Sequence, residues 1–332
     1  MNYYRANHRV RTNVSCTQLS KLQTTAHIFF MFKHAAKVAF MLLCCMITIK
    51  DVFEDYRQQI NGIYDTNETE AITLFVIAEV TGLSRASVKA FPERTLTAEQ
   101  SEQAKNILAE LKTGKPIQYI FGITEFFGLP FKVNPYVLIP RPETEELVEW
   151  ILEGERLKAK GERFSVLDIG TGSGCIAISL KKNLANADVS AIDISEGALE
   201  TAKENALLNE VEVNFILADI LNIEHDKEEA QYNIIVSNPP YVTLDDKKQM
   251  HSNVTDFEPH TALFVPEHDP LIFYRAIADF SLSNLIAGGL LFFEINENLG
   301  NETVELLTGK RFKNIELRKD MSGRDRMVKA QL

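Results

Sequence analysis

Cysteine is scarce in this sequence, and no pair of cysteines has the spacing of a zinc site. The four cysteines are Cys16, Cys44, Cys45 and Cys175, so the chain after residue 46 contains a single thiol. Structural zinc sites and disulfide frameworks both require several cysteines in one domain. The scarcity excludes both from the main part of the chain, for which we expect no metal, and is typical of a reducing cytoplasm.

Acidic residues are missing from the first 50 positions, which contain seven Lys or Arg. The other 282 residues carry 28 Lys or Arg against 46 Asp or Glu, a difference that gives this part a net charge of −18. An acidic surface disfavours a sequence-independent grip on nucleic-acid phosphates. We therefore expect no stable complex with nucleic acid.

Long uncharged apolar runs are also missing. The most apolar segment, residues 27–49, is interrupted by two lysines and a histidine, which leaves an uncharged run only over residues 38–49. This run is too short to span a bilayer, which takes about 20 residues. A signal peptide or an organellar targeting segment would explain parts of the composition. We favour an extension, residues 1–45, that is not part of the fold, and we expect a cytoplasmic protein without membrane contact.

Residues 46–123 have the apolar spacing of three and four that predicts helices, most clearly over residues 71–80 and 104–111. Thr97 and Gln100 predict a capping box ahead of the second of these helices. We expect a small helical domain.

Residues 124–140 alternate aromatic and β-branched side chains around a glycine and a proline, which predicts a β-hairpin that links two domains.

Over residues 141–332, short apolar strands alternate with helical stretches. This texture predicts an α/β domain with a doubly wound, mostly parallel, Rossmann-like sheet. Ligands of such sheets bind outside the carboxyl ends of the strands.

A glycine-rich loop follows the first of these strands in LDIGTGSGCIA, residues 167–177. The dinucleotide fingerprint is G-x-G-x-x-G, and Cys175 stands where its third glycine would be, which disfavours an NAD-dependent oxidoreductase. Asp168, two residues before the first glycine of G-x-G-x-G, gives a loop that resembles the S-adenosylmethionine loop of class I methyltransferases. A strand-to-helix turn without a ligand is the alternative. The loop residues expected to contact the cofactor are Gly170, Thr171, Gly172, Ser173 and Gly174, and Asn238, further along the chain, is expected to contact it as well.

Two later strands also end in aspartate. Asp193 lies nineteen residues after Gly174, where a carboxylate can accept hydrogen bonds from both ribose hydroxyls of a nucleoside cofactor. Asp219 ends the next strand and can face the adenine amino group, with Ile220 packed on the ring. Aspartate at a strand end is often only a helix cap, but the spacing from the glycine loop favours cofactor contacts.

Asn238, Pro239, Pro240 and Tyr241 follow the apolar run at residues 232–236. Proline has no N–H to donate, so strand pairing must stop here and leave carbonyl groups free. A bare turn is one interpretation. After a methyl-donor loop, however, N-P-P-Y resembles the signature of methyltransferases that act on a nitrogen conjugated with a π system.

Such a nitrogen is a poor nucleophile because its lone pair is delocalised. The side-chain oxygen of Asn238 and the carbonyl of Pro239 can hold both N–H bonds of the target, so that the lone pair points at the methyl group. Pro240 helps to fix the backbone, and Tyr241 can stack on the planar target. No strong general base is needed, and we expect the downstream His251 and His260 to be structural or exposed.

Together with these motifs, residues 114–149, which include RPETE, and the segments 257–263 and 320–328 resemble the release-factor glutamine methyltransferases of the PrmC/HemK family. The resemblance covers nearly the whole chain from Met46. It implies a class I methyltransferase that uses S-adenosylmethionine to methylate N5 of the glutamine in the Gly-Gly-Gln motif of class 1 peptide chain release factors. It also implies that the helical domain docks the release factor, and we expect a monomer. We expect structural or gate-forming roles for Arg141, Glu143 and Thr144.

Three other classes stay open at this stage. A nucleic-acid amino-group methyltransferase would share the catalytic residues but should add a recognition insertion and a basic face. A ribosomal-protein glutamine methyltransferase would share N-P-P-Y, although the RPETE context favours a release factor. A non-catalytic cofactor-binding protein would have no use for N-P-P-Y beside an intact glycine loop.

Overall fold

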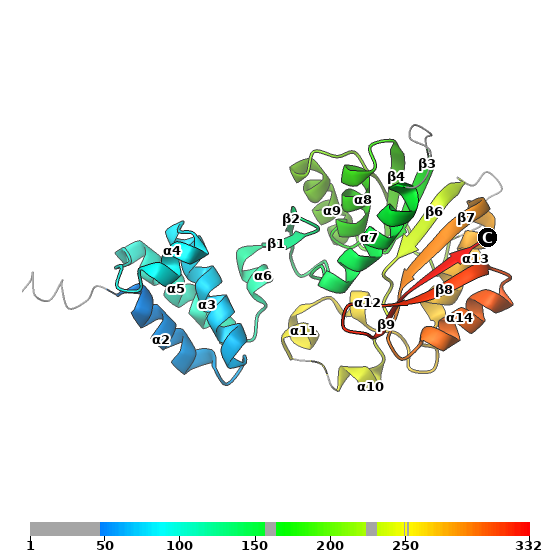
Figure 1. Ribbon diagram of the computed structural model, residues 1–332. Helices are drawn as coiled ribbons and strands as arrows, with labels where there is room; N and C mark the ends of the chain where they lie inside the picture. The colour runs from blue at the N-terminus through cyan, green and yellow to red at the C-terminus, as the bar shows by residue number, and fades with distance from the viewer. Residues whose placement is uncertain (1–46, 157–163, 224–230, 249, 251) are drawn as a thin grey trace, which may run out of the picture. The chain divides into compact units, whose positions relative to one another are not determined.

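The computed structural model of the chain (Figure 1) describes residues 47–156, 164–223, 231–248, 250 and 252–332. The chain divides into two compact units, Met1–Ala109 and Glu110–Leu332. The expected extension, residues 1–45, lies outside the described residues, as does His251.

The first unit is built from helices. Their bounds are α2 (Ile49–Ile60), α3 (Thr66–Thr81), α4 (Arg85–Ala90) and α5 (Ala98–Leu111), the last of which runs two residues into the second unit. The hydroxyl of buried Tyr56 in α2 donates to the carbonyl of Ala104 in α5 at 2.6 Å. The predicted capping box is confirmed, because the Thr97 amide donates to Gln100 Oε1 at 3.0 Å and the Gln100 amide donates to Thr97 Oγ1 at 3.1 Å.

The second unit begins with α6 (Ile117–Phe121) and a hairpin of β1 (Ile123–Phe126) and β2 (Leu129–Lys132). The predicted hairpin is confirmed, but it is shorter than expected and ends at Lys132. The amide of Lys132 donates to Asn205 Oδ1 at 2.6 Å and its carbonyl accepts from Asn205 Nδ2 at 3.0 Å. The strand therefore ends where its backbone bonds to a helix side chain.

A seven-stranded sheet forms the centre of the second unit (Figure 1). Its strands are β3 (Phe164–Ile169), β4 (Ala187–Asp193), β5 (Asn214–Leu217), β6 (Tyr232–Ser237), β7 (Leu285–Glu294), β8 (Lys313–Lys319) and β9 (Asp325–Gln331). They lie in the order β5-β4-β3-β6-β7-β9-β8. The pairs from β5 to β7 are parallel, and β9 is antiparallel to both of its neighbours. The prediction of a doubly wound, mostly parallel sheet is confirmed.

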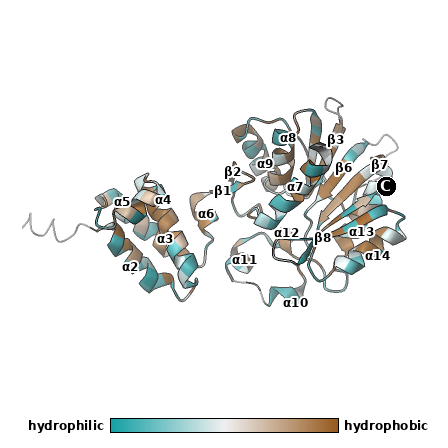
Figure 2. Cartoon of the chain, viewed as in Figure 1, coloured by the Kyte–Doolittle hydropathy of each residue, from teal (hydrophilic) through white to brown (hydrophobic). Residues whose placement is uncertain are grey.

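Helices cover both faces of this sheet. On one face lie α7 (Pro142–Arg156), α8 (Cys175–Asn183) and α9 (Glu196–Leu208), and on the other α13 (Ile272–Asn284) and α14 (Gly300–Gly309). Successive residues of a strand pack into the hydrophobic cores on opposite faces of the sheet. Val166 and Phe292 pack toward α7 and α8, whereas Leu167 and Phe293 pack toward α13. The central strands β6 and β7 are accordingly hydrophobic (Figure 2), as expected when both faces are covered, whereas the edge strand β8 is polar.

Three short helices follow β6, namely α10 (Leu244–Lys247), α11 (Ser252–Phe257) and α12 (His260–Leu263). In the part of the chain that the structure describes, no helix is both long enough and apolar enough to cross a membrane.

The capping box gives a testable expectation for the first unit. Thr97→Ala should destabilise the start of α5 by about 1 kcal/mol, because the Gln100 amide loses its acceptor. Amide hydrogen exchange in the first turn of α5 should then accelerate about fivefold. Exposed Gln103 lies in the same helix, and Gln103→Ala should leave the exchange unchanged or slower. Equal exchange in wild type and Thr97→Ala would show that the box contributes nothing.

Candidate functional site

The carboxyl ends of β3, β4 and β6 open onto a cavity of about 360 Å³, a size that suits a small-molecule ligand. Most of the residues predicted to form the site lie in its wall. They are Gly170, Thr171, Gly172, Ser173, Asp193, Asp219, Ile220, Asn238, Pro239 and Pro240. Gly174 and Tyr241, which were also predicted, are not lining residues.

The glycine loop is held by its own backbone against the end of β4. The amides of Gly170 and Thr171 both donate to the carbonyl of Ile192, at 2.9 and 3.0 Å. Gly172 has a φ of +55°, which turns its amide toward the carboxylate of Asp193 at 2.8 Å. A Cβ atom on Gly170 or Gly172 would meet no atom within 4 Å. The loop therefore exposes bare backbone to the cavity, as a closely approaching ligand requires.

Gly174 has a packing role in this structure. A Cβ atom there would lie 2.9 Å from Ile178 Cδ1 and 3.1 Å from the Cβ of Ala202, and the φ of Gly174 is +82°. The residue thus lets the loop and the start of α8 approach α9 closely. Its predicted contact with a cofactor stays a prediction.

Asp168 supports the loop from beneath. Its side chain is fully buried, and one carboxyl oxygen accepts from Thr171 Oγ1 at 2.6 Å and from the Ala177 amide at 3.3 Å. The other oxygen, Oδ1, has no partner among the described residues. Burial raises the pKa of this carboxyl to about 7, although both hydrogen bonds lower it.

Asp193 has two roles open to it. Its carboxylate oxygens accept from the amides of Gly172 at 2.8 Å and Ser195 at 2.9 Å, so the side chain already fixes the loop. Burial nevertheless raises the pKa of this carboxyl. Each carboxylate oxygen has two lone pairs, which leaves acceptor capacity for the hydroxyls of a ribose.

Asp219 forms the local hydrogen bonds of a turn residue. Its carboxylate accepts from the Leu221 amide at 2.9 Å and from Asn222 Nδ2 at 2.6 Å, which makes it the cap of its own turn. It also lines the cavity with Ile220, so the adenine contacts proposed for the two residues stay predictions.

The N-P-P-Y segment places one acceptor at the cavity. Ser237, the last residue of β6, donates its hydroxyl to the carbonyl of Ile169 at 2.6 Å and so fixes the strand end beside β3. The Asn238 carboxamide donates from Nδ2 to Thr144 Oγ1 at 3.2 Å. Its oxygen has no hydrogen-bond partner among the described residues and faces the free volume of the cavity.

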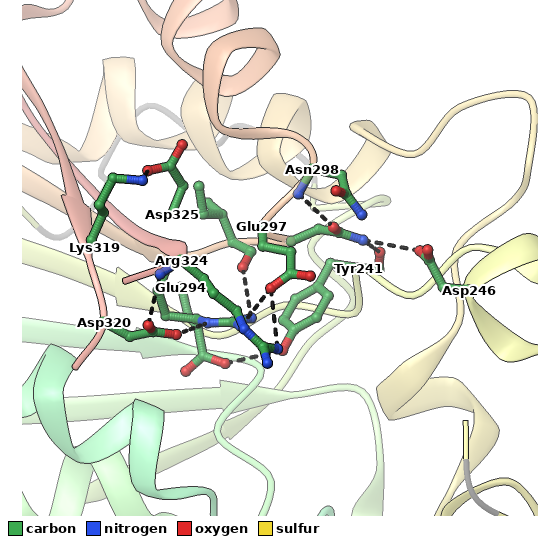
Figure 3. Close-up of polar contacts among 12 residues, drawn as sticks. Tyr241, Asp246, Glu294, Glu297, Asn298, Lys319, Asp320, Arg324 and Asp325 are labelled. Carbon is green, nitrogen blue, oxygen red and sulfur yellow. Dashed lines mark hydrogen bonds and ion pairs between the residues drawn. The ribbon is translucent and has the colours of Figure 1, made fainter. Parts of the chain in front are cut away.

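Tyr241 occupies a different place from the one expected. Its ring packs with the hydrophobic cluster around α13, and its hydroxyl donates to Glu294 Oε1 at 3.1 Å (Figure 3). Burial raises the pKa of this hydroxyl well above its ordinary range. Stacking of Tyr241 on a target therefore stays a prediction, and the observed contact joins the segment to the end of β7.

Arg141 has a structural contact that the sequence did not specify. Its guanidinium forms an ion pair with Glu258, which is 3% exposed and also accepts from the Ile139 amide at 3.2 Å. This pair ties the RPETE segment to residues 257–263, and both segments contribute to the cavity wall. His260 is hydrogen-bonded to the Thr255 carbonyl at 2.7 Å, which supports its expected structural role.

Sequence reasoning overlooked several cavity residues. Ile194 is 60% exposed at the rim directly after Asp193, where its position next to a strand-end acid could have suggested it. Phe273 comes from α13, and no local pattern marks it. Thr144 belongs to a quoted motif, but its partners, Asn238 and Glu294, could not be inferred from the sequence.

The strand order, the glycine loop after β3 and the acid at the end of β4 together define a methyltransferase of the class I fold. A family model described as the methyltransferase small domain matches residues 152–256. A second, described as the PrmC N-terminal domain, matches residues 51–122.

Two curated relatives narrow this class. The release factor glutamine methyltransferase of Flavobacterium psychrophilum is 51% identical over 282 residues, which cover 85% of this chain and 98% of the relative. That of Bacteroides thetaiotaomicron is 42% identical over 274 residues, covering 82% and 96%. This chain belongs to the release factor glutamine methyltransferase family.

A solved structure is also similar to the chain. It is the release factor-specific protein-(glutamine-N5) methyltransferase of Alicyclobacillus acidocaldarius, which is 30% identical, with a TM-score of 0.38. The match covers 60% of this chain and 98% of that one. The family assignment rests on the two sequence relatives.

The packing of Gly174 predicts a stability effect. Gly174→Ala should destabilise the second unit by about 1–3 kcal/mol, because the new methyl group overlaps Ile178 and the backbone is strained. Urea unfolding can be followed by the fluorescence of Trp150, the single tryptophan, which is buried in this unit. Gly309→Ala is the matched control, since nothing lies within 4 Å of its Cβ position. Equal midpoints for the two variants would contradict the packing role.

Proposed function

We propose that this protein transfers a methyl group from S-adenosylmethionine to the side-chain amide nitrogen N5 of the glutamine in the Gly-Gly-Gln motif of class 1 peptide chain release factors. The observation that carries the proposal is the free carboxamide oxygen of Asn238, which opens on the same cavity as the glycine loop and Asp193. Membership of the family supports the choice of substrate.

The cavity fits the proposed cofactor in size and chemistry. Backbone without side chains at Gly170 and Gly172 leaves room for close approach, and Asp193 offers acceptors for ribose hydroxyls. Ile194 and Ile220 supply apolar surface for a flat ring. When bound, S-adenosylmethionine supplies an electrophilic methyl group on a positively charged sulfonium.

The chain's own task is to align a weak nucleophile. Conjugation in an amide is strong enough to give a rotation barrier of about 18–20 kcal/mol, so the nitrogen lone pair is poorly available. Asn238 Oδ1 and the Pro239 carbonyl accept the two N–H bonds of the target amide and hold its nitrogen in line. Pro239 and Pro240 limit backbone rotation around these acceptors. Alignment of two reactants can contribute about 7–11 kcal/mol.

Proton removal makes little demand on the protein. The described residues that line the cavity include no histidine. A protonated N-methyl amide is strongly acidic, so its proton can leave to water once the methyl group is in place. The mechanism therefore needs orientation and desolvation more than a general base.

We extend the proposal to the organisation of the chain. Residues 46–123 dock the release factor, residues 124–140 link the domains, and residues 141–332 carry out methyl transfer. The family model that matches residues 51–122 supports a dedicated N-terminal domain. The enzyme acts as a monomer in the cytoplasm, without a stable nucleic-acid complex, which agrees with the acidic balance of the chain after residue 50.

The substrate is tested with the full chain, radiolabelled-methyl S-adenosylmethionine and three acceptors. A class 1 release factor should take up label, and the same factor with Gly-Gly-Ala in place of Gly-Gly-Gln should not, because its alanine has no amide nitrogen. DNA with ribosomal RNA serves as the third acceptor. Label on nucleic acid with none on protein would reject the proposed substrate.

Two substitutions should separate substrate orientation from cofactor binding. Asn238→Ala should lower kcat by roughly 100-fold with little change in the Kd of the cofactor, because it removes an acceptor used at the reacting nitrogen. Asp193→Ala should raise that Kd by about 10- to 100-fold, because it removes acceptors from the ribose and the loop. Calorimetry and steady-state kinetics measure the two effects, and equal losses in both variants would contradict the assignments.

A further inference from the structure

We propose that Thr144 and Glu294 are positioning residues that turn the carboxamide of Asn238 so that its oxygen faces the target amide. This inference rests on the proposed function. It names the two residues whose hydrogen bonds orient the Asn238 carboxamide as an acceptor. Thr144 lies in the first turn of α7 and Glu294 is the last residue of β7. Both are buried, at 3% and 1% exposure.

The polarity of the hydrogen bonds sets the direction of the carboxamide. Glu294 Oε2 accepts the Thr144 hydroxyl at 2.6 Å, and Oε1 accepts the Tyr241 hydroxyl at 3.1 Å. A threonine hydroxyl has one hydrogen, which is thus committed to Glu294. Toward Asn238, Thr144 can only accept, and the group that faces it at 3.2 Å must be the amide nitrogen. The planar carboxamide then presents its oxygen on the other side.

An ionised Glu294 enforces this order, because both of its oxygens can only accept. Burial raises the pKa of its carboxyl, but the two hydroxyl donors and the positive charge of Arg326 lower it. Glu143 is the other charged group that acts on it, and it opposes ionisation. A protonated Glu294 could donate to Thr144, which would then donate to Asn238 and reverse the carboxamide.

Arg326 is fixed by the C-terminal motif, residues 320–328. Its Nε donates to Asp320 at 3.2 Å, and its Nη1 donates to the Ile295 carbonyl at 3.4 Å. Glu297 lies 3.5 Å from the same guanidinium. These contacts hold the positive charge of Arg326, a residue that is 9% exposed, near the end of β7. They give the motif a function in the site although it lines no part of the cavity.

A reversed carboxamide would be costly for the reaction. Its NH₂ group would face the N–H bonds of the target, so that two donors would oppose each other where an acceptor is required. The target could still bind through the rest of the release factor. The expected signature is therefore a loss of kcat without a matching loss of affinity.

The test compares three threonine variants of the full chain. Thr144→Val keeps the shape but removes the hydroxyl, and it should lower kcat by about 10- to 100-fold because the acceptor is no longer aligned. The KM for the release factor and the Kd of S-adenosylmethionine should each change by less than about threefold. Thr144→Ser should restore kcat to within about threefold of wild type. Thr303→Val is the matched control, because it also removes a buried hydroxyl bonded at 2.8 Å, in α14, and it should keep wild-type kcat.

Glu294→Leu tests the role of the carboxylate, because leucine offers Thr144 no acceptor and leaves its hydroxyl free to donate to Asn238. We expect a lower kcat with an unchanged Kd of the cofactor. Wild-type kcat in Thr144→Val or in Glu294→Leu would overturn the inference, as would a Thr144→Ser variant no more active than Thr144→Val. If the wild-type chain itself transfers no label to the release factor, the proposed function fails instead.

Discussion

Parallel pairing of β3 with β4 and β6 is the constraint on which the site depends. Ile169 pairs with Ile192 on one side and with Ser237 on the other, so all three strands end at one level. Ile169 and Ser237 are 68 residues apart in sequence, yet a hydrogen bond joins them. Asp193 and Asn238 come directly after these paired residues. Both therefore lie at the same edge of the sheet and line one cavity.

Two buried carboxyl groups then fix the positions of the groups that the strand register brings to the cavity. Asp168 holds the glycine loop through Thr171, and Glu294 holds Asn238 through Thr144. Burial raises the pKa of both carboxyls, and hydroxyl donors offset part of that effect. A buried acid therefore lies behind the glycine loop, and another lies behind Asn238.

The sequence best predicted the candidate site residues that lie directly after strands of the parallel sheet. The loop, Asp193 and Asn238 could be located because alternating strands and helices fix where a parallel sheet binds ligands. The bond from Thr144 to Glu294 spans 150 residues, and no local spacing reveals such a pair. The place of Tyr241 depends on the cluster around α13, and that of Gly174 on a neighbour in α9, so both required the packed structure.

The strand order also bears on biosynthesis. β8 precedes β9 in the chain, but it pairs with the sheet only through β9, which lies between β7 and β8. A nascent chain that has been synthesised as far as β8 therefore has no position for this strand in the sheet. It also lacks Arg326, whose positive charge lowers the pKa of the buried Glu294 carboxyl. The glycine loop after β3 can form early in translation, whereas the sheet around Glu294 is completed only when residues 325–331 have left the ribosome.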